Sequence, residues 1–173
     1  MKVLNILALG AAVALAACVQ PKPKEKVDLS TKLKPGCYTV DLFDPYRIEY
    51  PDAAVPADAR QFLGVWKNGA WNGNWCHNLY VTKVHADGRV DVLDTHGPSP
   101  YTGVDATAFK RTGSIKNGVM SFRIDGLPVS YRLVDGFLVG QRKLKTGELE
   151  ITMSREDGIA QVPIPPVKPV RRS

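Results

Sequence analysis

Short runs of alternating apolar and polar residues fill the middle of the chain, from residue 62 to residue 153. The runs recur about every ten residues, as in all-β barrels and sandwiches, and glycine-containing turns separate them. Six turns carry a residue that tolerates positive φ, as tight hairpins require: Asn72-Gly73, Asp87-Gly88, Asn117-Gly118, Asp125-Gly126, Asp135-Gly136 and Thr146-Gly147. The pattern predicts an antiparallel meander of about eight strands.

Alternation within the runs predicts which side chains face the core. Residues two apart share one face of a strand, and four runs are apolar at such positions: Val90 and Val92; Met120, Phe122 and Ile124; Val129, Tyr131 and Leu133; and Leu149, Ile151 and Met153. The opposite face of the last run carries Glu148, Glu150 and Thr152, which is typical of a sheet with one wet face. We therefore expect these apolar positions to form the core.

Consecutive strands joined by short turns pair with each other, and closing such a sheet removes its exposed edges. We therefore predict an all-β fold, an antiparallel up-and-down meander closed into a barrel, in preference to a sandwich. Residues 38–60 fit this pattern less well, because Asp44-Pro45, Tyr50-Pro51 and Val55-Pro56 interrupt any regular element. They predict an arm that wraps the barrel and contains one short helical turn, capped by Asp58.

The beginning of the chain has the layout of an export signal. Lys2 supplies a positive charge, and the stretch from Val3 to Ala17 is apolar except for Asn5 and ends in small residues. A membrane-spanning helix needs about 20 apolar residues, whereas a polar, proline-rich segment follows this stretch before it reaches that length. It predicts a cleaved signal peptide.

The end of this stretch resembles the lipobox of bacterial lipoproteins. The residues concerned are Leu15, Ala16, Ala17 and Cys18, and in that family the cysteine becomes the lipidated first residue of the mature protein. The resemblance implies a lipid anchor, such as palmitate, on Cys18 in a Gram-negative cell envelope. Val19 stands where the inner-membrane retention signal has Asp, which implies transport to the outer membrane. An ordinary secretory signal is the alternative.

Two basic, proline-rich segments flank the predicted barrel. Residues 20–35 contain three prolines and five lysines, a composition that favours an extended, flexible linker. Residues 161–173 contain four prolines and three basic residues, which predict a disordered tail. The expected organisation is a signal peptide (1–17), a lipidated cysteine with a flexible linker (18–35), a β-barrel domain (36–160) and the tail (161–173).

The net charge of +6 lies at the two ends of the chain. Residues 1–35 carry six lysines against two acidic residues, and residues 161–173 carry three basic residues. Residues 36–160 contain fourteen basic and fifteen acidic residues, so the barrel has no excess of positive charge for binding phosphates. We therefore expect no nucleic-acid partner, and we expect the basic ends to lie against anionic surfaces of the envelope.

The chain contains three cysteines. If Cys18 carries the lipid, Cys37 and Cys76 remain in an oxidising compartment, where we expect them to form a disulfide. Two unpaired thiols are the alternative.

All three tryptophans lie within residues 66–75. Gly64, Val65 and Trp66 resemble the Gly-x-Trp signature of lipocalins and related calycin barrels, in which the tryptophan closes one end of the barrel. With the Asp-Gly hairpins that lead to residues 135–140, the chain resembles small β-barrel modules of proteobacterial envelope proteins. The resemblance implies a calycin-like barrel. The chain lacks the Thr-Asp-Tyr motif of true lipocalins, so their mode of ligand binding is not carried over.

A ligand site is expected at one end of the barrel. Parity with Phe62 predicts that Trp66 is buried, and parity with Leu79 and Val81 predicts the same for Trp75. Trp71 lies between two glycine turns, and we expect it to be exposed. The longest loop, residues 94–106, is the other place where binding residues concentrate. The candidate ligand-binding residues are Trp71, Asn72, Asn74, His96 and Tyr101.

No pattern of catalytic or metal-binding residues is found in the sequence. Cys76 and His77 are adjacent and would point to opposite faces of a strand. Ser99 lies outside any Gly-x-Ser-x-Gly elbow, and the spacing of His77, His85 and His96 matches no zinc motif. We therefore expect no enzymatic activity, no cofactor and no metal.

These observations predict a membrane-tethered, non-catalytic binding module for a small apolar molecule or a glycan, bound inside the barrel or at its loops. The internal version needs a void, which an interior filled by Trp66, Phe122 and Tyr131 would exclude. The alternative is a structural or interaction lipoprotein, an assembly partner or an inhibitor, that uses its outer surface and basic tails.

Overall fold

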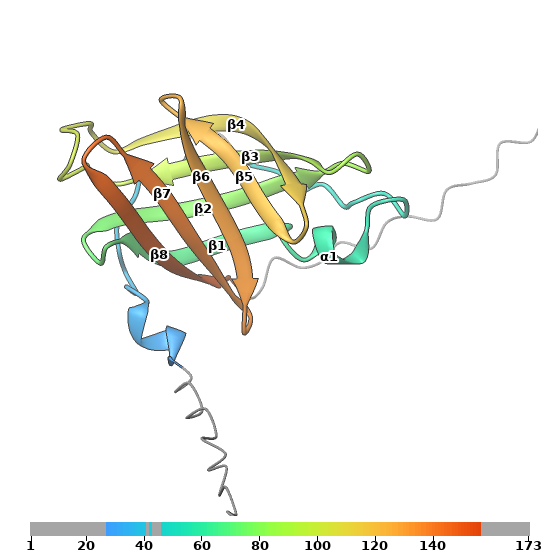
Figure 1. The fold of residues 1–173 in the computed structure, drawn as a ribbon, viewed down its shortest axis with the longest axis horizontal. Helices are drawn as coiled ribbons and strands as arrows, with labels where there is room; N and C mark the ends of the chain where they lie inside the picture. Colours follow the sequence, from blue (N-terminus) through green and yellow to red (C-terminus); the bar gives the residue numbers. More distant parts are fainter. Residues whose placement is uncertain (1–26, 41, 43–45, 157–173) are drawn as a thin grey trace, which may run out of the picture.

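The computed structural model describes residues 27–40, 42 and 46–156 (Figure 1). The predicted signal peptide, the predicted lipid on Cys18, residues 18–26 of the predicted linker and the predicted tail lie outside the described residues. Residues 27–35 of that linker are described and include the short 3-10 helix η1 (Leu29–Lys32). Within the described residues, no helix combines the length and the apolar character needed to cross a lipid bilayer.

Eight antiparallel strands form a closed barrel in sequence order, as predicted (Figure 1). The strands are β1 (Gly64–Trp71), β2 (Trp75–Val84), β3 (Arg89–His96), β4 (Thr107–Lys116), β5 (Val119–Ile124), β6 (Leu127–Val134), β7 (Phe137–Leu144) and β8 (Gly147–Arg155). Two residue pairs between β1 and β8, Trp66↔Arg155 and Lys67↔Ser154, close the sheet. The up-and-down barrel predicted from the turns and inferred from the lipocalin resemblance is thus confirmed.

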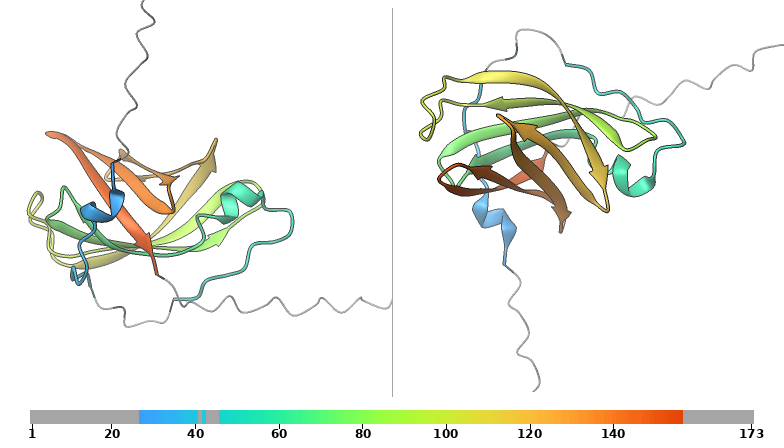
Figure 2. Two further views of the ribbon diagram at one scale, coloured as in Figure 1. Left: turned by 90° about the horizontal axis from the view of Figure 1, so that it is seen from below. Right: turned by 45° about the horizontal axis from the view of Figure 1, so that its top comes forward.

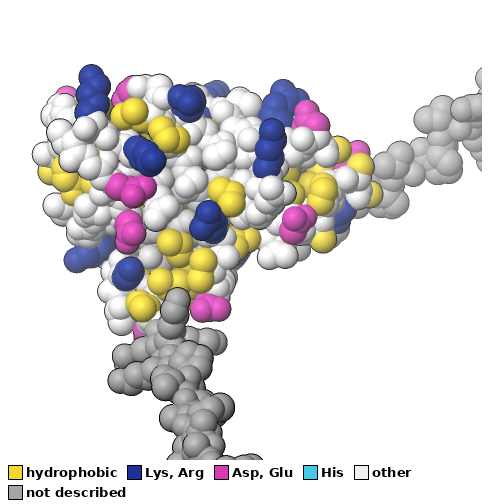
Figure 3. Space-filling view, viewed as in Figure 1, with side chains coloured by type: hydrophobic (Ala, Val, Ile, Leu, Met, Phe, Trp, Pro, Cys, Tyr) yellow, Lys and Arg dark blue, Asp and Glu magenta, His cyan; other side chains and the backbone are white. Residues whose placement is uncertain are grey.

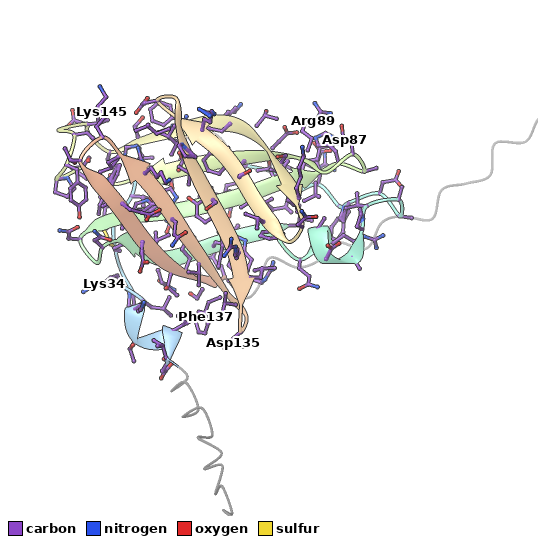
Figure 4. All side chains as sticks on the ribbon, in the orientation of Figure 1. Lys34, Asp87, Arg89, Asp135, Phe137 and Lys145 are labelled. Atoms are coloured by element: carbon purple, nitrogen blue, oxygen red, sulfur yellow. A yellow bond between two sulfur atoms is a disulfide. The ribbon has the colours of Figure 1, made fainter. Side chains whose placement is uncertain are left out.

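The predicted turns occur where expected. Asn117, Asp125 and Asp135 have positive φ, as do the glycines that follow them, so three hairpins have the backbone that matches the twist of the flanking strands. The β1–β2 turn, the β3–β4 loop, the β5–β6 turn and the β7–β8 turn lie at one end of the barrel, which we call the loop end. Lys145 marks the loop end in Figure 4, and Arg89 and Asp135 lie at the opposite end.

The barrel is least regular between β4 and β5. β4 pairs with β3 along nearly all of its length, from Ser114 to Thr107 at the loop end. Its described pairs with β5 are Ser114↔Ser121, Ile115↔Met120 and Lys116↔Val119. Residues 107–113 of β4 therefore continue toward the loop end with one paired edge, and the wall of the barrel opens there.

Side chains fill the middle of the barrel. The apolar positions predicted from alternation are buried, except that Leu133 is partly buried and packs against the core. Trp66, Phe122 and Tyr131 all belong to the buried core, and Phe122 stacks on Tyr131 with 5.7 Å between ring centroids. A close-packed interior of this kind leaves no room for a ligand in the middle of the barrel.

The N-terminal arm crosses the outer face of β2, as the proline pattern predicted (Figure 2). A disulfide joins Cys37 to Cys76 on β2, with the Cα atoms 5.4 Å apart, which confirms the predicted pairing. The arm continues beyond it: the Asn78 side chain donates a hydrogen bond to the buried Thr39 hydroxyl, and the Tyr46 and Tyr80 rings lie 4.4 Å apart. The disulfide and these contacts hold the arm against the barrel.

The short helix α1 (Ala57–Arg60) covers the end of the barrel opposite the loop end (Figure 1). Ala59 and Phe62 join the core, and the Trp66 indole N–H donates to the Phe62 carbonyl at 2.9 Å. The helical turn was predicted, but its cap was not: Pro56 is the N-cap, and Asp58 lies inside the first turn. Pro56 has a φ of −56° and a ψ of 143°, the extended backbone that is typical of an N-cap residue.

Candidate functional site

Four aromatic rings lie together at the loop end, and we call them the aromatic cluster: Trp75, His96, Tyr101 and Phe109. Trp75 begins β2, His96 ends β3, Tyr101 lies in the β3–β4 loop and Phe109 lies on β4. The Trp75 ring centroid is 5.1 Å from that of His96 and 6.0 Å from that of Tyr101, and the His96 and Phe109 centroids are 5.9 Å apart. The cluster thus joins three parts of the loop end into one surface.

Hydrogen bonds fix the loop that carries Tyr101. The Ser99 hydroxyl accepts from the backbone N–H groups of Tyr101 and Thr102. The Tyr101 hydroxyl donates to the Asn74 side-chain carbonyl at 2.7 Å, and the Trp75 indole N–H donates to the Gly97 carbonyl at 2.9 Å. The loop and the β1–β2 turn are therefore connected at the loop end.

The cluster has a buried side and an open side. Trp75 and His96 are buried, whereas Tyr101 and Phe109 are each 40% exposed. Phe109 pairs with the buried Asp94 across the β3–β4 ladder, so its side chain belongs to the inner face of the barrel. It is exposed because β5 does not extend alongside this part of β4. Inward-facing aromatic surface is therefore accessible from solvent at this end.

A surface hollow of about 570 Å³ lies beside this opening. The hollow lies between β4 and β5, beside the start of β6, and its lining residues are Thr112, Gly113, Ser114, Ser121, Phe122, Arg123 and Pro128. It adjoins the residues of β4 that follow Phe109 and Arg111. A ligand of ordinary small-molecule size would fit a space of this volume.

A buried polar cluster lies below the aromatic cluster and consists of His77, Asp94, Arg111 and Tyr131. The Arg111 Nε donates to Asp94 Oδ2 at 2.7 Å. His77 Nε2 lies 3.1 Å from the Tyr131 hydroxyl and 3.3 Å from Asp94 Oδ1. These residues come from β2, β3, β4 and β6, so the network ties together strands on both sides of the interior.

Burial sets the protonation states in this cluster. It lowers the pKa of His77 to about 4, against the opposing effect of Asp94, so the imidazole is neutral near pH 7. Burial also raises the pKa of the Tyr131 hydroxyl well above its usual value, and the nearby Asp94 adds to this effect. Within the described residues, His77 Nδ1, Asp94 Oδ1 and the Trp71 indole Nε1 are buried without a hydrogen-bond partner.

Arg142 on β7 connects the two clusters. Its guanidinium lies over the Trp75 ring, with Cζ 4.6 Å from the ring centroid. Arg142 also interacts electrostatically with Asp94, which favours its charged form, and with Arg111, which opposes it. The loop end therefore combines an aromatic surface with two interior cations.

The structure brings together three of the five predicted ligand-binding residues. Asn74, His96 and Tyr101 lie around the aromatic cluster. Asn72 lies on the β8 side of the loop end, where its side-chain carbonyl accepts from the backbone N–H of Glu150. The fifth residue, Trp71, lies inside the barrel.

The predicted exposure of Trp71 is wrong, because its side chain is completely buried. Trp66 pairs with Leu79, but Gly69 pairs with His77, so the register shifts by one residue between Trp66 and Gly69. Asn68 has a φ of 58° at this β-bulge. The extra residue reverses the alternation of faces, and Trp71 points inward beside the His77 ring, with 5.4 Å between centroids.

Five residues of the site were not predicted from the sequence: Asp94, Phe109, Arg111, Tyr131 and Arg142. A signal was present, because Asp94 continues the face of Val90 and Val92, and Arg142 has the parity of Leu138. Charged residues at core positions of a strand are costly unless they are paired or functional. This pattern would have indicated an interior polar site.

Comparison with known proteins leaves the family of the chain open. No protein-family model matches the chain, and no curated protein matches it. Among solved structures, the chain is similar to the crystal structure of a mutant of the fluorescent protein UnaG. The two are 14% identical, the similarity covers 57% of this chain and 98% of that chain, and the TM-score is 0.39.

Proposed function

We propose that the protein is an outer-membrane lipoprotein, anchored through Cys18, whose barrel binds a small, largely apolar molecule at the loop end without catalysis. The observation that carries the proposal is the solvent-exposed ring of Phe109 on the inner face of β4. A barrel normally covers the inner face of every strand. Here the short β5 leaves that face open, next to three further aromatic rings.

The composition of the aromatic cluster suits a ligand with an apolar or ring-shaped part. Aromatic rings offer large apolar areas with few rotatable bonds, and Tyr and Trp add a polar group that orients a ligand. The Tyr101 hydroxyl and the Asn74 amide supply such groups at the rim. A glycan stacked on Tyr101 and Phe109 is the polar variant of the same proposal.

The loop end is favoured over the middle of the barrel because the interior is filled. Trp66, Phe122 and Tyr131 occupy the space that an internal ligand would need. A ligand at the loop end needs no rearrangement of these side chains, since Tyr101 and Phe109 are already exposed.

Two features support export and anchoring. The lipobox-like residues Leu15, Ala16, Ala17 and Cys18 precede the barrel, and the barrel carries the disulfide Cys37–Cys76. Disulfides persist in oxidising compartments such as the periplasm.

On the face shown in Figure 3, basic and acidic side chains are interspersed, which fits a domain held at the membrane by its lipid. Mass spectrometry of the membrane fraction should find diacylated or triacylated Cys18 at the mature N-terminus; an unmodified Cys18 refutes the anchor.

A second candidate, an interaction lipoprotein, is favoured by the edge of β4. Residues 107–113 have only one edge paired in the described ladder, and such an edge can accept a strand from another protein. Crosslinking in whole cells from an exposed position such as Lys110 would then yield a stoichiometric protein adduct.

Binding at the loop end is tested with the neutral fluorophore N-phenyl-1-naphthylamine, whose emission rises in apolar sites. The protein used for this test carries the substitution Cys18→Ser, which removes the acylation site and leaves the described residues unchanged. Phe109→Ser should weaken binding by about tenfold or more, because a large contact ring is lost. Val134→Ser is the matched control, since Val134 is equally exposed, at 40%, and ends β6 at the opposite end of the barrel.

The expected result is saturable binding that Phe109→Ser impairs and Val134→Ser leaves unchanged. Absence of saturable binding, or equal effects of the two substitutions, refutes a loop-end site for apolar molecules. A rise in melting temperature with oligosaccharides alone selects the glycan variant.

A further inference from the structure

Arg142 occupies an interior position on β7. It pairs with Leu149 on β8 and with Val129 on β6, and both of these neighbours are buried core residues. Arg142 itself is only 6% exposed. A fully ionised guanidinium at a core position is costly unless hydrogen bonds and opposite charge compensate it.

The guanidinium has only part of that compensation from the described residues: Asp94 favours its charged form, but burial has the largest effect on its pKa and lowers it. No hydrogen bond or ion pair joins Arg142 to another described residue, and its guanidinium lies over the Trp75 ring. Stacking on an aromatic ring uses the flat face of a guanidinium and leaves the N–H groups at its edge available. Five donors in a planar fork, held at the base of an aromatic site, match the geometry of an oxyanion.

The charges around Arg142 also favour an anion. Asp94 is the acidic member of the polar cluster, and Arg111 already binds it at 2.7 Å. His77, the other group near Asp94, is neutral near pH 7 because burial lowers its pKa to about 4. Asp125, in the β5–β6 turn, also favours the charged form of Arg142, but its side chain is exposed to solvent. Among the groups inside the loop end, two arginines face one aspartate, which leaves one excess positive charge. A monoanionic group would balance it.

We propose that Arg142 is the anion-binding residue of this site, so that the natural ligand is amphipathic and carries a carboxylate or another small oxyanion. The apolar part lies on the aromatic cluster, and the oxyanion reaches the guanidinium edge of Arg142 beside Trp75. This inference rests on the proposed loop-end binding function and specifies its class of ligand.

The test compares two fluorophores that share one ring system. The sulfonate 1-anilinonaphthalene-8-sulfonate carries the oxyanion, whereas N-phenyl-1-naphthylamine is its neutral counterpart. Arg142→Met keeps the length and apolar volume of the side chain and removes the charge and the donors. Lys143→Met is the matched control, because it removes one positive charge at the next residue, on the exposed outer face of β7.

We expect Arg142→Met to weaken binding of the sulfonate by about tenfold or more, the size of a lost charge-assisted hydrogen bond. Binding of the neutral fluorophore should change by less than about twofold, within the effect of a volume-conserving substitution. Lys143→Met should leave both unchanged. The melting temperature without ligand should not fall in Arg142→Met, because a buried charge without a hydrogen-bond partner is removed.

Each other outcome refutes the inference, and the two proposals fail in different ways. If the wild-type chain binds neither fluorophore, the loop-end site and the anion-binding role both fall. If Arg142→Met weakens both fluorophores equally, or neither, the apolar site stands and the anion-binding role falls. If the melting temperature of Arg142→Met drops by more than about 5 °C, Arg142 is a structural residue and the role falls as well.

Discussion

The ion pair between Asp94 and Arg111 provides the most direct test of the interior polar cluster. Asp94 is 1% exposed and Arg111 18% exposed at the side chain, and Nε lies 2.7 Å from Oδ2. Asp94→Asn keeps the shape of the side chain and removes its charge. Two interior arginines, Arg111 and Arg142, then lose their acidic neighbour.

The expected cost follows from the burial of the pair. Removing one partner of a buried ion pair costs about 3 to 5 kcal/mol, because the other charge is left uncompensated. Arg111 is partly exposed and can recruit water, so we expect the lower part of that range, about 3 kcal/mol. The double variant Asp94→Asn with Arg111→Met should regain part of this loss, because the unpaired charge is gone.

The assay is urea unfolding at pH 7, followed by tryptophan fluorescence and extrapolated linearly to water. Asp91→Asn is the matched control, since Asp91 lies on the outer face of the same strand and pairs with His85 at 2.8 Å with 40% of its side chain exposed. Surface pairs contribute about 0 to 1 kcal/mol. If Asp94→Asn costs no more than Asp91→Asn, the cluster does not stabilise the barrel in the way described.

Three further predictions concern the rest of the barrel. Replacing both Cys37 and Cys76 by Ala should lower the free energy of unfolding by about 2 to 4 kcal/mol, measured by urea unfolding against the oxidised wild type; an unchanged value would show that the arm is held without the disulfide. Burial depresses the pKa of His77 to about 4 in the folded state, so the unfolded chain binds the proton first as the pH falls. His77 therefore contributes stability, up to about 3 kcal/mol, that is present above about pH 6.5 and lost as the pH falls toward 4. His77→Gln should flatten this part of the plot of unfolding free energy against pH, and slopes equal to those of wild type would contradict the prediction. A Cβ atom on Gly140 would lie 2.6 Å from the Tyr131 ring and 2.8 Å from Ile151, so Gly140→Ala should lower the free energy of unfolding by about 1 to 3 kcal/mol; a melting temperature equal to that of wild type would show that the interior is looser than these contacts indicate.

The barrel could be predicted from the sequence because its signals are local. Turn dipeptides such as Asn117-Gly118 fix where the chain reverses, and alternation fixes which residues face inward. Both signals act over a few residues and need no knowledge of distant contacts. The disulfide followed from counting cysteines, given the lipobox. These features survive in the structure because tertiary packing agrees with the local preferences.

Trp71 shows where local reasoning fails. The alternation that correctly buries Trp66 would turn Trp71 outward, five residues later along an ideal strand. The bulge at Asn68 adds one residue and turns Trp71 inward. Asn68-Gly69 is a signal for such a bulge, because asparagine tolerates positive φ and a glycine inside a strand often marks a bulge. The signal was overlooked, and the register itself is set by pairing with β2 and β8.

The site residues were missed for a related reason, which also bears on their role. Phe109 is exposed because β5 is shorter than β4. The alternation within one strand does not show how far its partner strand extends beside it, so this difference in length could not be predicted from either strand alone. Asp94, Arg111 and Arg142 all lie toward the loop end, where this opening admits solvent. At the opposite end the buried side chains, among them Phe62 and Trp66, are apolar, and Arg155, which lies over the Trp66 ring there, is exposed. A barrel under selection for stability alone would place apolar residues at both ends. The concentration of interior charge at the open end therefore argues that these residues are retained for contact with a ligand, and the loss of sulfonate binding in Arg142→Met without a loss of stability would separate that role from a structural one.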